Sequence, residues 1–166
     1  MNVRADDRPG GTDVREVLTA LGFVLGVNLL GASPSAVVGA DTSWIDRPWF
    51  YPPEIAFPVV WTLLFTLLGI ATYLVWRGTD RRAVRVALAA FGVQFALNLA
   101  WTPLFFGLRR PDLALGVIGL LAVAIAGTIL AYGRVDRRAA ALLVPYLAWV
   151  LFAIVLNYAS YGSAAG

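Results

Sequence analysis

Residues 55–76 read IAFPVVWTLLFTLLGIATYLVW, an apolar stretch that is bounded by Glu54 and Arg77 and contains no charged residue. A helix needs about 20 consecutive apolar residues to cross the hydrocarbon core of a bilayer, and this stretch has that length. The remainder of the chain repeats the pattern. Four further runs lack Asp, Glu, Lys and Arg, namely 17–40, 86–108, 113–133 and 139–166. Together the five runs predict five transmembrane helices.

The composition agrees with a membrane protein, since 60% of the 166 residues are hydrophobic and the mean hydropathy is +0.75. In lipid only helices and closed barrels satisfy the backbone polar groups. Barrel strands would alternate apolar and polar residues over about 10 positions, and these runs do not alternate. We therefore expect an all-α polytopic membrane protein, a five-transmembrane-helix bundle that forms a single domain over residues 17–162.

Residues 1–16 mix both signs of charge with proline and glycine, a composition typical of disordered segments. We expect them to form a disordered cytoplasmic tail. The acidic residues in this tail and the span length of the run 17–40 argue against a cleaved signal peptide.

All 13 basic residues are arginine, and their distribution predicts an orientation. With five spans, the N-terminus shares a side with the second and fourth loops. That side would hold Arg4, Arg8, Arg15, Arg77, Arg81, Arg82, Arg85, Arg134, Arg137 and Arg138. The opposite side would hold only Arg47, Arg109 and Arg110. The positive-inside rule then places the N-terminus in the cytoplasm and the C-terminus outside, with the cell membrane as the expected location. The basic balance thus reflects topology and anionic membrane lipid, and no nucleic-acid partner is expected.

Several kinds of chemistry are disfavoured because the chain has no Cys, no His and no Lys. It can form no disulfide, no zinc site with the usual ligands and no Schiff base. The five runs also lack the carboxylates that proton relays place inside the membrane. Serine and threonine have no histidine or lysine base to activate them. We expect no catalytic residue, no metal site and no required cofactor.

Aromatic rings and amides gather on one stripe of three expected helices. At 100° per residue, the members of each set fall on a common face. They are Phe57 and Trp61 in the run 55–76, then Gln94, Asn98, Trp101 and Phe105 in the run 86–108, and Tyr146, Trp149, Ala153 and Asn157 in the run 139–166. Amides in hydrocarbon need partners, so these stripes should point inward. They predict a pocket for a flat, apolar ligand. The competing interpretation is that the amides only join helices to one another.

The opposite face of the run 86–108 carries the small residues Gly92, Ala96 and Ala100. Small residues at a spacing of four allow two transmembrane helices to approach closely. This face is therefore interpreted as the contact of a homodimer. Packing within a single chain explains the pattern equally well.

Residues 44–61 read WIDRPWFYPPEIAFPVVW and crowd rings and prolines at the start of the second expected helix. Tryptophan and tyrosine at a membrane surface ordinarily serve as anchors, an interpretation that suits Trp44, Trp49 and Tyr51. It explains less well why Trp61, Trp101 and Trp149 recur beside amides or tyrosines within the runs.

Three stretches of the chain resemble the TspO/MBR family. They are RPWFYPPEIAFPVVWTLLFTLLGIATY (47–73), QFALNLAWTPLFFGLRR (94–110) and LLVPYLAWVLFAIVLNY (142–158), within a resemblance that covers about residues 20–160. The family includes the tryptophan-rich sensory proteins of bacteria and the mitochondrial translocator protein, or peripheral-type benzodiazepine receptor. The motifs are long and keep their order along the chain.

The resemblance implies a five-helix bundle, commonly a homodimer, that binds porphyrins and related tetrapyrroles, haem included, as ligands within the membrane. Carried over position by position, it assigns ligand binding to Trp49, Phe50, Phe57, Trp61, Asn98, Trp101, Phe105 with Phe106 following, Tyr146, Trp149, Ala153 and Asn157. Gln94 joins this set through its place on the stripe of the run 86–108. Pro48, Pro52 and Pro53 would stiffen a loop that caps the pocket. The family also implies two alternatives, which are light-dependent porphyrin breakdown through pocket tryptophans and a scaffold that binds lipid or sterol. The end of this chain, LNYASYGSAAG, lacks the basic residue of the family's sterol-associated motif.

Overall fold

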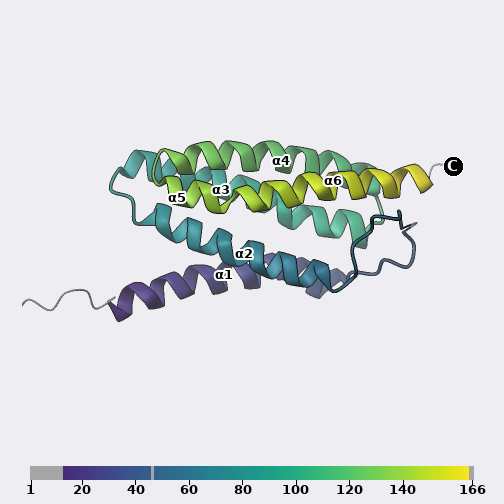
Figure 1. The fold of residues 1–166 in the computed structure, drawn as a ribbon, viewed down its shortest axis with the longest axis horizontal. Coiled ribbons are helices and arrows are strands. Elements are labelled where there is room, and N and C mark those ends of the chain that lie inside the picture. Colours follow the sequence, from purple (N-terminus) through teal and green to yellow (C-terminus); the bar gives the residue numbers. More distant parts are fainter. Residues whose placement is uncertain (1–12, 46, 165–166) are drawn as a thin grey trace, which may run out of the picture.

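The computed structural model describes residues 13–45 and 47–164, the side chains as far as residue 159. These residues form α1 (Val14–Val38), α2 (Ala56–Trp76), α3 (Arg81–Thr102), a π-helical turn η1 (Pro103–Gly107), α4 (Pro111–Gly133), α5 (Arg137–Leu142) and α6 (Val144–Ala164). No strand occurs within the described ranges. Five helical segments there are long and apolar enough to cross a membrane, because η1 continues α3 and α6 continues α5. The predicted all-α class and five spans are confirmed (Figure 1).

The beginnings and ends of the helices follow from short-range signals. Asp80 caps α3 by accepting hydrogen bonds from the backbone N–H groups of Arg82 and Ala83, as N-cap carboxylates do. Asp13 accepts from the N–H of Arg15 in the same way. Helix α1 therefore begins within the last residues of the predicted tail 1–16, while residues 1–12 of that tail lie outside the described part of the chain.

The fifth span is interrupted near its start, as Pro145 predicts. Proline has no N–H to donate and its ring clashes with the preceding helical turn. The structure accordingly divides the span at Leu143, between α5 and α6.

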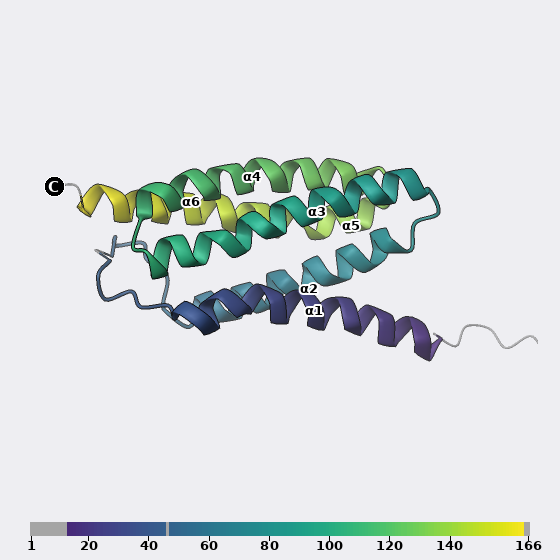
Figure 2. The same cartoon turned by 180° about the vertical axis from the view of Figure 1, so that it is seen from behind.

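The helices lie side by side along the long axis of the molecule (Figures 1 and 2). Helix α1 packs against α2, and α4 packs against both α3 and α6. The loop 39–55 lies at the same end of the bundle as the C-terminus, whereas α1 begins at the other end (Figure 1). The other helices are joined by short turns, so the loop 39–55 is the longest connection between described helices.

The contact between α1 and α2 is close because glycine occupies it. A Cβ atom added at Gly69 would lie 2.6 Å from the Cα atom of Val24, closer than any real side chain approaches a backbone. One added at Gly31 would lie 2.5 Å from the ring of Phe65. Small residues bring transmembrane backbones together in this way, which fixes α1 on the bundle although Val27 is its only buried residue in the described chain.

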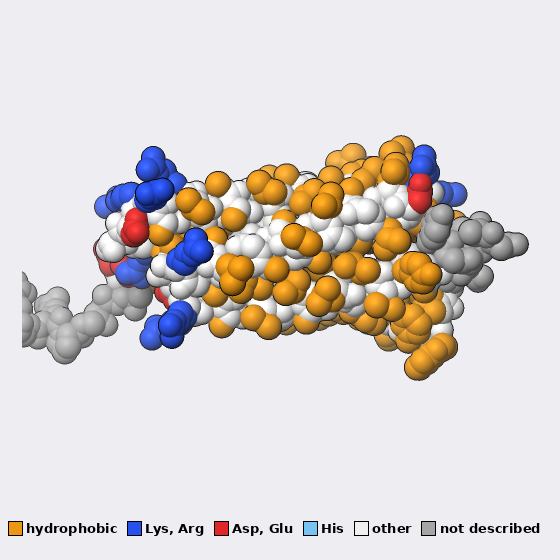
Figure 3. Space-filling model, turned by 90° about the horizontal axis from the view of Figure 1, so that it is seen from above, with side chains coloured by type: hydrophobic (Ala, Val, Ile, Leu, Met, Phe, Trp, Pro, Cys, Tyr) orange, Lys and Arg blue, Asp and Glu red, His pale blue; other side chains and the backbone are white. Residues whose placement is uncertain are grey.

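The outer surface between the two ends of the bundle is apolar. Figure 3 shows hydrophobic side chains along the length of the molecule and arginines gathered at its ends. Large apolar side chains such as Leu29, Val93, Val123 and Leu130 are more than half exposed. A surface of this kind fits immersion in lipid.

The three small residues of the predicted dimer face, Gly92, Ala96 and Ala100, are all exposed. Apart from the adjoining backbone of α3 itself, no described atom lies within 4 Å of a Cβ placed at Gly92. The face is thus not used for packing within one chain, and it is open to lipid or to a second copy.

Candidate functional site: a cavity enclosed by the five spans

A cavity of about 530 Å³ lies between the helices, a volume typical of small-molecule sites. Helices α1, α2, α3, α4 and α6, the turn η1 and the loop 39–55 all contribute to its lining. Most of the predicted site residues are among the lining residues, namely Phe57, Trp61, Asn98, Trp101, Phe105, Trp149, Ala153 and Asn157. The stripes on three helices therefore converge on one space.

Aromatic rings form much of the cavity wall. Phe57 of α2 meets Trp149 of α6 edge to face, with ring centroids 6.0 Å apart. Trp61 packs against Phe65 at 5.2 Å, and Trp101 stacks on Phe105 at 4.9 Å. Such ring pairs are stabilising beyond their buried area, and they hold flat faces ready for a flat ligand.

The π-helical turn directs two consecutive rings into the cavity. Pro103 has no N–H to donate to the carbonyl one turn earlier, and the helix widens there. The N–H of Leu108 then bonds to the carbonyl of Pro103 at 2.8 Å, a span of five residues. Both Phe105 and Phe106, within this turn, line the cavity.

Gln94 and Tyr146 lie behind the wall, fully buried, and do not line the cavity. The Asn98 amide donates to the Tyr146 hydroxyl at 3.0 Å, and that hydroxyl donates to Gln94 Oε1 at 3.1 Å. Gln94 Nε2 has no hydrogen-bond partner among the described residues. For Gln94 and Tyr146 the structure thus matches the competing interpretation, a hydrogen-bond network between α3 and α6.

A second network fixes the wall near Trp101. The indole N–H of Trp101 donates to Asn157 Oδ1 at 3.1 Å, and Asn157 Nδ2 donates to the carbonyl of Pro111 at 2.9 Å. These bonds connect α3, α6 and the start of α4. The N–H of Trp101 is thus engaged with Asn157, and the indole ring lines the cavity. Asn98 also lines the cavity, and its amide donates to Tyr146 behind the wall.

Trp49 and Phe50 do not line the cavity. Trp49 is 96% exposed and meets Phe50 edge to face at 5.7 Å. Its exposure fits the membrane-anchor interpretation of the loop tryptophans. The neighbouring Tyr51 contributes its ring to the lining instead.

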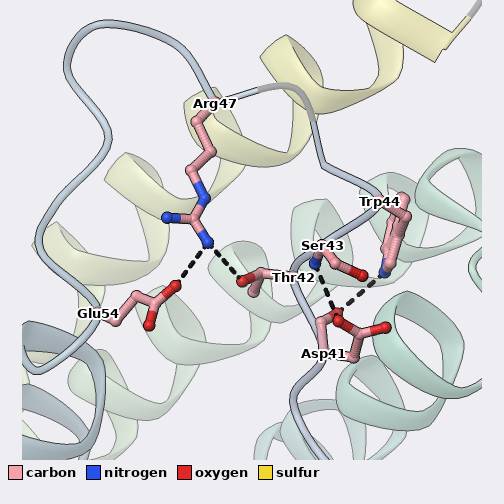
Figure 4. Close-up of polar contacts among 6 residues, drawn as sticks. All are labelled: Asp41, Thr42, Ser43, Trp44, Arg47 and Glu54. Carbon is pink, nitrogen blue, oxygen red and sulfur yellow. Dashed lines mark hydrogen bonds and ion pairs between the residues drawn. The ribbon is translucent and has the colours of Figure 1, made fainter.

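The loop 39–55 covers one end of the cavity, which we call the loop end; it is lined by Ala40, Thr42, Ile45, Tyr51 and Glu54. Figure 4 shows Arg47 Nη2 reaching Glu54 Oε1 at 2.5 Å and Thr42 Oγ1 at 2.9 Å. Arg109, in the turn before α4, pairs with Asp41 at 3.1 Å. The loop is thus held by one ion pair within itself and one to the adjacent turn.

Two ionisable groups of the loop are perturbed. A hydrogen bond from the backbone N–H of Ser43 to the Asp41 carboxylate (Figure 4) lowers the pKa of Asp41, and Arg109 lowers it further. Partial burial raises the pKa of Tyr51. Asp41 therefore stays charged and Tyr51 stays neutral around pH 7.

Comparison with known proteins agrees with this architecture. A model of the TspO/MBR family matches residues 19–161. The translocator protein of Homo sapiens is 39% identical over 146 residues, which cover 84% of this chain and 86% of that protein. The chain belongs to the TspO/MBR family.

The tryptophan-rich protein TspO of Chlorobaculum tepidum is 38% identical over 150 residues, covering 87% of this TspO/MBR chain and 94% of its relative. The tryptophan-rich sensory protein of Cereibacter sphaeroides is 36% identical over 130 residues, covering 76% and 80%. The resemblance inferred from the three motifs is confirmed.

Part of the cavity lining of this TspO/MBR protein is not predicted by the sequence patterns. Helix α1 contributes Asn28, Gly31, Ala32 and Ser35. The remaining residues that were not predicted are Pro58, Thr62, Phe65, Thr102, Ile118, Leu121 and Leu156, besides the loop end. Most of them are small or aliphatic and carry no pattern of their own. Asn28 is different, because an amide inside a charge-free run is a signal that could have been used.

Proposed function

We propose that this TspO/MBR protein is an integral membrane receptor that binds porphyrins and related tetrapyrroles within the cavity, in a translocator or sensory role. The observation that carries the proposal is the convergence of Trp61, Trp101 and Trp149, from three helices, on one cavity of about 530 Å³. The names of its relatives, translocator protein and tryptophan-rich sensory protein, support the same role.

The chemistry of the lining suits such a ligand. Ring faces stack on a macrocycle, and Asn98 offers an amide for one of its polar groups. The usual axial ligands of haem iron are His, Cys and Met. The chain has no His or Cys, and its single Met is Met1. Binding therefore rests on stacking and shape, with the tetrapyrrole as ligand and no resident cofactor.

The setting of the receptor is also part of the proposal. We place it in the cell membrane with its N-terminus in the cytoplasm, on the evidence of the arginine distribution. The loop end of the cavity then faces outward. The exposed small face Gly92, Ala96 and Ala100 serves as the homodimer contact.

A titration of the purified protein with protoporphyrin IX, followed through the Soret absorbance of the porphyrin, tests the binding. We expect saturation at one site per chain and weakened binding by the Trp149→Leu variant. The matched control is Trp49→Leu, because that ring is 96% exposed and outside the lining. Binding without saturation, or equal loss in both variants, contradicts the proposal and favours a lipid-holding scaffold.

A second candidate function is light-dependent breakdown of the bound porphyrin. It is favoured by the position of Trp61 and Trp149 on the same cavity, because indoles beside a photoexcited macrocycle can exchange electrons with it. Porphyrin spectra recorded in the dark and under illumination separate the candidates. Loss of the Soret band only in the light, and not with Trp61→Phe, supports breakdown; an unchanged spectrum supports a receptor alone.

A further inference from the structure

The loop end of the cavity carries a charge that the binding of a purely apolar ligand does not explain. Glu54 is the one charged side chain among the described residues that line the cavity. Its carboxylate accepts a hydrogen bond from Arg47, and the same Arg47 nitrogen donates to Thr42, which also lines the cavity (Figure 4). Arg47 is not itself a lining residue, but its contacts with two lining residues, Glu54 and Thr42, hold the guanidinium beside the cavity.

The guanidinium retains donors for another partner. Both of its hydrogen bonds to described residues use Nη2, and a guanidinium has five N–H donors in a planar fork. The Thr42 hydroxyl accepts from Arg47, which leaves its own hydrogen free to donate. A cluster of donors therefore faces the loop end, with the Glu54 carboxylate as its present acceptor.

Aromatic contacts connect this cluster with the interior of the cavity. The Arg47 guanidinium carbon lies 5.3 Å from the centroid of the Tyr51 ring. Tyr51 in turn packs against Phe57 at 5.5 Å, and both rings line the cavity. An apolar body lodged among the rings can therefore extend an acidic substituent along Tyr51 to Arg47.

We propose that Arg47 determines the specificity of the cavity for ligands with a carboxylate at one edge of a flat apolar body, and that this carboxylate replaces Glu54 on the guanidinium. The inference rests on the proposed tetrapyrrole binding and selects the acidic members of that class. Replacing one carboxylate with the other costs little, because the Arg47 guanidinium keeps a carboxylate partner before and after the ligand binds. The displaced Glu54 side chain is 67% exposed, so its charge passes into water. An exposed ion pair of this kind is weak, whereas a bidentate carboxylate on arginine is among the stronger hydrogen-bonded pairs.

Arg109 supplies a matched control. It pairs with Asp41 on the same loop, and neither residue lines the cavity. The Arg109→Gln variant removes one positive charge at the same end of the bundle and loosens the loop, without changing the donors at the loop end. Any change in ligand affinity in this variant therefore comes from the lost charge or from the loosened loop, and not from a lost hydrogen bond to the ligand.

The test compares protoporphyrin IX with its dimethyl ester, which has the same macrocycle without free carboxylates. The full chain is titrated with each in one detergent. We expect the acid to bind about tenfold more tightly than the ester, because a bidentate carboxylate on Arg47 is a stronger pair than the exposed contact with Glu54 that it replaces. Arg47→Gln should abolish the preference and change ester affinity no more than Arg109→Gln does, and Arg47→Lys should restore part of the preference. Glu54→Gln should strengthen binding of the acid alone, because it removes the competing carboxylate.

The outcomes separate the two proposals. Equal binding of acid and ester by the wild type overturns this inference and leaves the receptor proposal intact. Absence of saturable binding of either porphyrin overturns both. If Arg47→Gln, Glu54→Gln and Arg109→Gln all weaken both ligands alike, the ion pairs only order the loop, and the inference also fails. Thermal unfolding of each variant in the same detergent identifies any that is misfolded. If Arg47→Gln is misfolded, Arg47→Lys replaces it in the test: a preference for the acid that is smaller than in the wild type supports the inference, and an unchanged preference overturns it.

Discussion

Asn98 Nδ2 lies 3.0 Å from the hydroxyl oxygen of Tyr146, which joins α3 to α6 immediately behind the cavity wall. The contact places one amide at two interfaces, because Asn98 also lines the cavity. Ligand recognition and helix packing therefore meet at this side chain, and substitutions on its two sides should have different effects.

Replacing Tyr146 with Phe tests the contribution of these hydrogen bonds to the packing of α3 against α6. The change removes the donor to Gln94 Oε1 and the acceptor of the Asn98 amide. Hydrogen bonds between transmembrane helices average about 0.6 kcal/mol, so we expect a loss of about 1 kcal/mol in the free energy of unfolding, seen as a lower midpoint of thermal unfolding in detergent. Porphyrin affinity should change little, because Tyr146 is fully buried behind the wall. A large loss of affinity with unchanged stability would contradict this arrangement.

Replacing Trp61 or Trp149 with Leu tests the ligand side. Stacking of aromatic rings is worth about 0.5–1.5 kcal/mol beyond area burial, so each variant should weaken protoporphyrin binding several-fold. Asn98→Leu removes an amide of similar size; if the amide contacts the ligand, affinity should fall by about 0.5–1.5 kcal/mol. Parallel titrations and thermal unfolding measure both effects. Unchanged affinity in all three variants would mean that these side chains are only core.

Protoporphyrin IX and haem should bind with similar affinity. The residues that usually ligate haem iron are missing apart from Met1, so the iron adds no bond to the stacking of the macrocycle. Titration of each ligand, together with the absorption spectrum of the haem complex, checks this. A strong preference for haem accompanied by a sharp ligand-field spectrum would show that an oxygen ligand such as tyrosine holds the iron.

If the small face of α3 is the homodimer contact proposed above, Ala96→Leu should shift the protein toward monomer. A larger side chain on the exposed small face of α3 prevents close approach of two backbones, while the cavity lies on the opposite face of that helix. Sedimentation or light scattering in detergent measures the oligomeric state, and porphyrin titration should be nearly unchanged. Val123→Leu is the control, since Val123 is 73% exposed on α4. A variant that remains dimeric would place the contact elsewhere.

Gly69→Ala should destabilise the protein. The added Cβ would lie 2.6 Å from the Cα atom of Val24, and relief requires α1 to move. Overpacking of this kind costs about 1–3 kcal/mol. Gly127→Ala is the matched control, because no described atom lies within 4 Å of its Cβ position and alanine favours a helix. Thermal unfolding of the pair should show a clear loss for the first and no loss for the second.

The sequence alone was sufficient for the five spans and for the direction of several side chains. A charge-free run of span length has few folded alternatives in lipid. The helical period then relates Asn98 to Trp101, and Trp149 to Ala153, whatever the neighbours are. This is why residues from three separate runs could be assigned to one inward face before the bundle was known.

The tertiary structure decided what lies opposite each face. Gln94 and Asn98 belong to one stripe, yet Tyr146 covers Gln94 while Asn98 reaches the cavity. Trp49 and Tyr51 are two residues apart in a loop without a period, and only Tyr51 lines the cavity. Periodicity fixes a side chain relative to the axis of its own helix. The distance between helices and the path of a loop depend on contacts between distant residues, such as Gly69 with Val24 and Arg47 with Glu54, which no local pattern encodes.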